Sequence, residues 1–183
     1  VFLGADGTMR LKAGEVSFTL NPDGSYDPQE FMRQLGGQEA GLRKLTVQEF
    51  LDNRDACLSR LSETGSGRPE AAGIAQRAAR LRALKEKVRE LVGTGMSYDE
   101  AKQSAQSWIK TQAALHDPDM IAGGRPDGIT GMGDKNVNSA LGSLWRHGRA
   151  QQLDNTVRKL AAGMTEAQRR QTLLDVRLVP SEP

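Results

Sequence analysis

Three helix-starting signatures fix much of what this chain can fold into. Each pairs a Thr or Ser hydroxyl with a Glu or Gln side chain three residues later, and such capping boxes satisfy backbone N–H groups that the first turn of a helix leaves free. The three boxes are Thr46 with Glu49, Ser97 with Glu100, and Thr165 with Gln168. The sequence therefore predicts helices that begin at these three points.

Apolar periodicity extends these helices and adds others. Apolar residues recur at helical spacing after the first box, and a second helix is predicted from Pro69 to Gly93. A third follows the second box, and a short helix is predicted to start with Asn138 as its cap. Residues 153–160 carry another apolar stripe. The prediction is a mainly α fold.

A small β element is predicted near the N-terminus. Residues 9–11 and 16–20 alternate in polarity and are separated by residues 12–15, which suits a hairpin, and turn-forming residues follow at 21–25. The predicted class is therefore α+β. The tail at residues 176–180 is interpreted as either a short strand or an extended end.

The length of 183 residues suits one main domain. We predict an N-terminal extension at residues 1–40, which contains the hairpin and could link to an upstream carrier, and a functional domain at residues 41–183. Because the chain begins at Val1 rather than Met, we interpret it as a piece of a longer polypeptide. No apolar run approaches the roughly 20 residues that a membrane helix needs, so no membrane span is predicted.

Few residues of this chain can bind metals through sulfur or nitrogen. The single cysteine, Cys57, excludes an internal disulfide framework and every cysteine-rich zinc site, and the two histidines, His116 and His147, exclude a large histidine cluster. Any metal site must therefore rest mainly on oxygen ligands.

Charge is distributed unevenly along the chain. Residues 1–67 hold 7 Lys and Arg against 10 Asp and Glu, whereas residues 68–183 hold 18 against 13. The basic later part favours a polyanionic partner. A solvated helix face explains the run of cations between residues 77 and 89 about as well, so both interpretations stay open.

The most informative stretch contains His116 and Asp119, at a predicted helix junction. Residues three apart in a helical turn share a face, so the two side chains could point into one site. We predict that both face one solvent-accessible cleft with acidic walls. An imidazole titrates near neutral pH and suits proton abstraction from water, and a carboxylate is a natural ligand for a hard divalent cation. The pair could therefore hydrolyse a phosphodiester, with Asp119 binding the metal.

A glycine-rich segment follows this pair at once. Residues 123–133 hold five glycines, which can bring backbone amides close to a phosphate, and polar groups follow near residue 135. We predict that this loop lines the substrate groove and makes few core contacts. The predicted substrate-binding set comprises Gly123, Gly124, Arg125, Lys135, Asn136, Asn138 and Ser139. A role for Asn138 as a helix cap alone is equally open.

Other conspicuous residues have plainer interpretations. Trp145 follows an apolar stripe at helical spacing and is interpreted as core rather than as a base-stacking platform. His147 lies between two arginines and is interpreted as a surface residue. Cys57 falls in the apolar register of its helix, which predicts a buried, inert thiol.

Three blocks of this sequence together resemble the polymorphic toxin type 15 domain. These blocks are residues 45–54, 113–124 and 131–145. The resemblance implies a compact helical nuclease toxin domain, of the DNase effectors of type VI secretion, with a glycine-rich active-site loop. It also implies that the His-x-x-Asp motif, here His116 and Asp119, is catalytic.

The sequence thus leads to one main hypothesis. It is an antibacterial toxin effector that hydrolyses DNA with a divalent metal, expected to be Mg²⁺, and that a cognate immunity protein neutralises. The toxin would be made in the producer cytoplasm, engage a secretion-apparatus carrier or adaptor, and enter the target bacterial cytoplasm. Two alternatives stay open: an RNase that uses His116 with His147, and a non-catalytic helical adaptor module.

Overall fold

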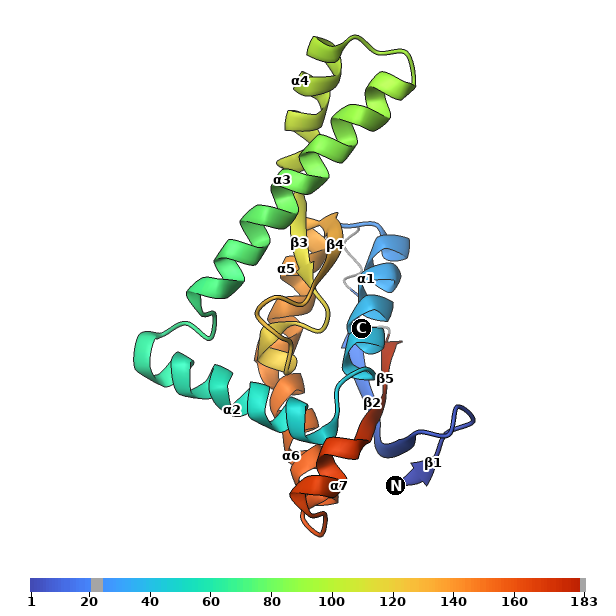
Figure 1. The fold of residues 1–183 in the computed structure, drawn as a ribbon, viewed down its shortest axis with the longest axis vertical. Helices are drawn as coiled ribbons and strands as arrows, with labels where there is room; N and C mark the ends of the chain where they lie inside the picture. The colour runs from blue at the N-terminus through green and yellow to red at the C-terminus, as the bar shows by residue number, and fades with distance from the viewer. Residues whose placement is uncertain (21–24, 182–183) are drawn as a thin grey trace.

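The computed structural model describes residues 1–20 and 25–181 (Figure 1), so the turn predicted at residues 21–25 falls largely outside the described part. The described helices are α1 (Pro28–Leu42), α2 (Val47–Thr64), α3 (Glu70–Gly93), α4 (Tyr98–Ile109), α5 (Lys135–Leu144), α6 (Ala150–Ala161), α7 (Glu166–Gln171), the short 3₁₀ helix η1 (Met120–Ala122) and the π-helical turn η2 (Trp145–Arg149). The strands are β1 (Phe2–Leu3), β2 (Met9–Thr19), β3 (Gln112–His116), β4 (Ile129–Asp134) and β5 (Thr172–Ser181). The predicted α+β class, mainly α, is confirmed.

All three predicted capping boxes are present at helix starts. In α2, α4 and α7 the cap hydroxyl accepts a backbone N–H three residues on, and the Glu or Gln side chain accepts the N–H of the cap residue. The predicted cap at Asn138 is wrong. Asp134 caps α5 by accepting from the N–H groups of Asn136 and Val137, which places Asn138 inside the helix.

The two ends of the described chain lie side by side in one sheet. Strand β5 runs parallel to β2 from Met9 opposite Thr172 to Thr19 opposite Ser181, and β1 pairs antiparallel with the start of β2. The hairpin predicted within residues 9–20 is wrong, because β2 is one continuous strand. Gly14, with φ of 82°, sits where the register shifts, so the segment predicted to turn forms a bulge instead.

A second sheet, the hairpin of β3 and β4, was not predicted. The glycine-rich segment supplies β4, which pairs antiparallel with β3 from Gln112 opposite Asp134 to His116 opposite Ile129. Side chains of α1 bond the backbone of β4. The bonds are Asp134 N–H to Glu30 at 3.1 Å, Gln34 to the Asp134 carbonyl at 3.0 Å, and Arg33 to the Met132 carbonyl at 3.2 Å. Helix α1 therefore covers groups that an edge strand would leave unpaired.

One hydrophobic core joins the N-terminal segment to the rest of the chain. Phe18 of β2 and Phe31 of α1 are fully buried, and the ring of Phe18 meets the edge of Trp145 with centroids 4.7 Å apart. The hydrophobic core therefore continues across the domain boundary that the sequence predicted after residue 40. Burial of Trp145 and Cys57 agrees with the sequence interpretation.

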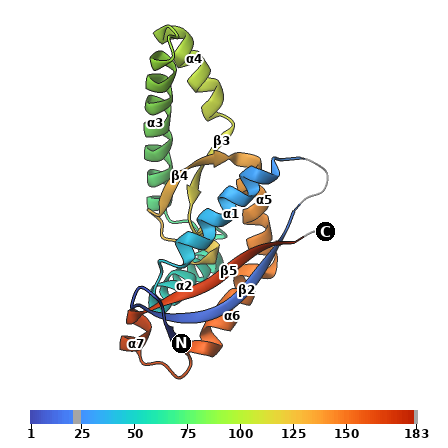
Figure 2. The same ribbon diagram turned by 90° about the vertical axis from the view of Figure 1, so that its right-hand side faces the viewer.

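Helices α3 and α4 form an antiparallel hairpin, here termed the arm, that projects from the body (Figures 1 and 2). Of the residues of α3, only Ala72 is buried, and Ile74 and Leu81 are each more than half exposed. Among the described helices, none combines the length and apolar character that crossing a bilayer requires.

We expect Phe18→Ala to lower the free energy of unfolding by about 3–5 kcal/mol, because it empties a site in the shared core. Urea unfolding followed by circular dichroism would measure it. Phe2→Ala, at a residue that is 41% exposed, is the matched control and should change little. Equal effects of the two substitutions would mean that residues 1–40 do not stabilise the body.

Candidate active site

The candidate site is built on the connection between β3 and η1. His116 ends β3, a cis Asp117–Pro118 peptide follows, and Asp119 caps η1 by accepting the N–H of Ile121 at 3.0 Å. Backbone groups satisfy part of this connection, since the Asp117 N–H donates to the Gly128 carbonyl at 3.2 Å and the Asp119 carbonyl accepts the N–H of Gly124 at 3.0 Å. The His116 carbonyl and the Asp119 N–H take side-chain partners instead.

Gln38 of α1 supplies both of those partners. It is buried, and its amide nitrogen donates to the His116 carbonyl at 2.9 Å and to the Asp117 carboxylate at 3.2 Å. Its amide oxygen accepts the N–H of Asp119 at 2.6 Å and the indole N–H of Trp145 at 3.2 Å. All four hydrogen-bonding positions of one amide are thus used to hold the loop that carries both predicted catalytic residues.

Two glycines let α1 approach that loop. A Cβ at Gly37 would lie 2.8 Å from the Asp117 carboxylate, and one at Gly41 would overlap the Asp117 carbonyl. Larger residues at either position would push α1 away and break the contacts of Gln38.

The His116 imidazole is almost fully buried, with 5% of the residue exposed. Its Nε2 lies 2.9 Å from the Pro126 carbonyl, and because a carbonyl only accepts, Nε2 carries the proton and Nδ1 carries the lone pair of the neutral ring. Burial lowers the pKa of His116 below its ordinary value of 6.5, the carbonyl partly opposes this, and the charge of Arg68 lowers it further. The ring is therefore neutral near pH 7 and able to accept a proton.

Asp119 lies in the wall of a cavity of about 290 Å³. Residues from α2, the α2–α3 loop, η1 and η2 line it. They are Cys57, Leu61, Gly65, Ser66, Gly67, Arg68, Asp119, Met120, Ile121 and Arg146. The sequence led us to expect acidic walls and an exposed His116, and both expectations are wrong, because the charged groups beside Asp119 are Arg68 and Arg146 and His116 does not line this cavity.

Only one of the two oxygens of the Asp119 carboxylate accepts a hydrogen bond from a described residue. Oδ1 accepts from Ile121, while Oδ2 has no hydrogen bond to any residue in the described part of the chain. Within that same part, no group of three or more His, Cys, Asp or Glu is arranged to hold a metal. Asp119 thus offers one carboxylate oxygen, a donor type that Mg²⁺ takes, and the other ligands of such an ion would have to come from water and substrate phosphate.

Helix α2 anchors the same loop through two adjacent residues. The buried Arg54 donates to the Ile121 carbonyl and pairs with the buried Asp154 at 3.4 Å, and Asn53 donates to the Gly123 carbonyl at 2.8 Å. Arg54 was not predicted as a site residue. It falls in the apolar register of α2, and a charged side chain in that register was a signal that it would be buried and paired.

The structure places Gly123 and Gly124 in the packing beneath the site. Both are buried, a Cβ at Gly123 would lie 2.7 Å from the Phe50 ring, and one at Gly124 would overlap the Pro118 carbonyl. We expected this loop to make few core contacts, and that expectation is wrong.

The remaining predicted substrate residues fall into separate places. Asn138 and Ser139 precede Gly142 by about one turn of α5, and a Cβ at Gly142 would lie 3.4 Å from Asp119 Oδ2, so this side of α5 faces the site. Lys135 and Asn136 are exposed at the start of α5. The register of β3 and β4 puts that end four residues from His116, roughly 13 Å along the strand.

Arg125 belongs to a different cavity, of about 410 Å³. It is paired with Glu49 and lines this cavity together with Asp117 and Lys44. Burial raises the pKa of Asp117, whose carboxylate accepts from Thr130 and Gln38. The structure therefore separates Arg125 from Asp119.

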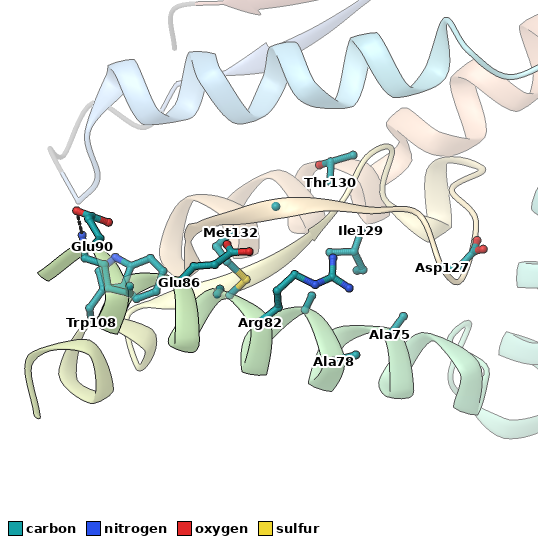
Figure 3. Close-up of a pocket in the computed structure, with 14 residues that line it drawn as sticks. Ala75, Ala78, Arg82, Glu86, Glu90, Trp108, Asp127, Ile129, Thr130 and Met132 are labelled. Carbon is teal, nitrogen blue, oxygen red and sulfur yellow. Dashed lines mark hydrogen bonds and ion pairs between the residues drawn. The ribbon is translucent and has the colours of Figure 1, made fainter. Parts of the chain in front are cut away.

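The largest cavity described, about 600 Å³, is a groove between α3 and β4 (Figure 3). It contains neither His116 nor Asp119. His147 is exposed, as interpreted from the sequence, and its Nδ1 lies 2.7 Å from the carbonyl of Ser143 in the preceding turn.

Comparison with known families gives one match over most of the chain. A family model described as novel toxin 15 matches residues 25–179. No curated protein matches the chain. The matched range includes α1, both candidate catalytic residues and most of β5.

We expect Gly124→Ala to lower the free energy of unfolding by more than about 2 kcal/mol, because the new methyl group would overlap the Pro118 backbone. Gly131→Ala is the control, since a Cβ there meets nothing within 4 Å. Thermal unfolding of the two variants would test this. Equal stability would show that the loop can move away from Gly124 at no cost.

Proposed function

The chain belongs to the novel toxin 15 family, and from this premise we propose that it is an antibacterial toxin that hydrolyses the phosphodiester bonds of DNA. The observation that carries the proposal is the cavity around Asp119. It combines a carboxylate oxygen that no described residue hydrogen-bonds with the cations Arg68 and Arg146. A neutral imidazole, that of His116, lies in the same loop.

Each group has a role that follows from its chemistry. Arg68 and Arg146 bind the phosphate oxygens, since a guanidinium can donate two parallel hydrogen bonds to them. Nδ1 of His116 accepts a proton from the attacking water. The residue that would hold a divalent metal is Asp119, and such a metal would supply neutralisation of charge on the phosphoryl oxygens.

The two alternatives draw less support from the geometry. An RNase that uses His116 with His147 needs both imidazoles at one substrate, yet Nδ1 of His147 lies against its own helix and His147 does not line the cavity around Asp119. A non-catalytic adaptor would give no reason to place an acid beside two arginines in a cavity. The resemblance to DNase effectors favours DNA over RNA as the substrate.

Partners and delivery form part of the same proposal. A toxin that acts on DNA would damage its producer, so a cognate immunity protein would block the site, and a secretion-apparatus carrier or adaptor would deliver the toxin into the target bacterial cytoplasm. An acidic inhibitor would suit the basic part of the chain, because complementary charge speeds association.

We expect the purified chain to nick supercoiled plasmid in Mg²⁺ and to lose this activity in EDTA. Asp119→Asn should reduce the rate about 100-fold or more, because it removes the anionic oxygen that would hold the metal. Agarose gels of plasmid and of total RNA, each with and without EDTA, provide the measurement. Asp99→Asn, on the exposed start of α4, is the matched control and should retain full activity.

Two results would contradict the proposal. Cleavage of RNA that persists in EDTA would favour the RNase, and absence of cleavage of either nucleic acid by the unmodified chain would favour the adaptor.

The pH dependence should report on His116. A general base acts only when deprotonated, so the rate should fall to half its plateau at a pH below 6.5, the ordinary imidazole value, since the pKa of His116 is lowered. Arg68→Gln removes a cation that opposes protonation, which should move the acidic limb to higher pH. Arg146→Gln should lower the rate without moving the limb. An acidic limb at the same pH in both variants would exclude His116 as the base.

A further inference from the structure

The solvent face of α3 carries cations that form no ion pair with any described residue. Of the six Lys and Arg side chains of α3, Arg80 donates to the carbonyls of Ile109 and Gln112, and Lys87 pairs with Glu90 at 2.8 Å. The other four have no ion pair with any residue that the structure describes. These four, here termed the arm cations, are Arg77, Arg82, Lys85 and Arg89, and all are exposed.

The arm cations are spaced so that they repel one another. Arg82, Lys85 and Arg89 follow one side of the helix, three and four residues apart, which brings their charges close. Like charges at these spacings destabilise a helix by about 0.2–0.5 kcal/mol for each pair. Glu86, four residues after Arg82 and three before Arg89, offsets part of this repulsion, but the structure describes no ion pair for any of the three cations. A bound polyanion would offset the rest.

Two of the three anionic side chains of α3 line a groove, which two of its cations, Arg82 and Lys87, line as well. Glu86 and Glu90 line the groove between α3 and β4, where Figure 3 shows them beside Met132 and Trp108. Arg82 extends along the same groove toward Ile129, so it stands at the rim, and Lys85 and Arg89 do not line the groove. The groove side of α3 therefore carries charges of both signs, whereas Lys85 and Arg89 project to solvent outside it.

The arm also begins next to the cavity around Asp119. Arg68 lines that cavity and lies two residues before α3. The 24 residues of α3 span about 36 Å at 1.5 Å per residue, close to one turn of B-form DNA. A duplex whose phosphate reaches Arg68 has the length to run beside the arm cations.

We propose that the solvent face of α3 is a second binding surface for the substrate, on which Arg77, Lys85 and Arg89, with Arg82 at the rim, bind the phosphate backbone of duplex DNA outside the catalytic cavity. This inference rests on the proposed function and adds a surface that holds the substrate. Contacts of this kind depend on charge rather than base identity, which suits a toxin that must act on any chromosome.

A protein partner is the competing occupant. Ile74 and Leu81 are exposed on the same helix and would favour a partner with an apolar surface. The arm cations, which lack ion pairs with described residues, favour a polyanion as the occupant. The two apolar side chains carry less weight, because isolated exposed apolar side chains are ordinary on protein surfaces.

The test measures DNA binding without cleavage. All proteins carry Asp119→Asn, and fluorescence anisotropy of a labelled 30-base-pair duplex is recorded over a series of salt concentrations. Lys85→Gln with Arg89→Gln should lower the slope of log affinity against log salt by roughly 1.8, about 0.9 for each lost phosphate contact. The control, Lys12→Gln with Lys159→Gln, removes the same charge from exposed positions elsewhere and should leave the slope unchanged.

Charge, rather than a particular side chain, should decide the result. Lys85→Arg with Arg89→Lys should therefore keep the slope of the parent. If the Gln pair gives the same slope as the control pair, the inference is wrong, and Ile74 and Leu81 then indicate a protein partner.

This outcome can be separated from that of the plasmid assay. If the unmodified chain does not cleave DNA but the Gln pair lowers the slope, the DNA-binding surface on α3 stands and the proposed activity is wrong. If the chain cleaves plasmid but the Gln pair leaves the slope unaltered, the proposed activity stands and the second binding surface on α3 is wrong.

Discussion

The four hydrogen bonds of Gln38 are the contact on which the candidate site depends. The loop from His116 to Asp119 has an irregular backbone, and buried polar groups without partners would each cost about 1–3 kcal/mol. Gln38 satisfies two of its backbone groups and also fixes Asp117 and Trp145. Because Gln38 belongs to α1, the position of the site is tied to the packing of α1, and hence to the segment that sequence analysis set apart.

Local signals predicted the helices well and the strands poorly. The capping boxes and apolar stripes of α2, α3 and α4 depend on residues within one helix, so they can be read from a short window. The pairing of β2 with β5 joins residues about 160 positions apart, and no local pattern specifies it. Helix α1 escaped prediction because the adjacent Gly36 and Gly37 weaken the helical signal, although Gly37, with Gly41, is what allows its close packing on Asp117.

The candidate site was predictable only in the part that is contiguous in sequence. His116 and Asp119 share one loop, and their chemistry could be anticipated from residue type and spacing. Arg68, Arg146 and Gln38 come from three other elements, and only the fold brings them to that loop. Lys135 was grouped with the site because a glycine-rich segment was interpreted as a flexible loop. Part of it is strand β4, which holds Lys135 at the opposite end of a hairpin.

The parallel pairing of β2 with β5 also bears on when the core is completed during synthesis of the chain. Strand β5 is the last described element, and the core that holds Phe18 includes Leu174, Val176 and Leu178 from that strand. A ribosome-bound chain that has not yet reached residue 181 lacks this side of its core. Completion of this core therefore requires translation through the last strand, so the native packing of Phe18 forms only after nearly all of the described chain has been synthesised.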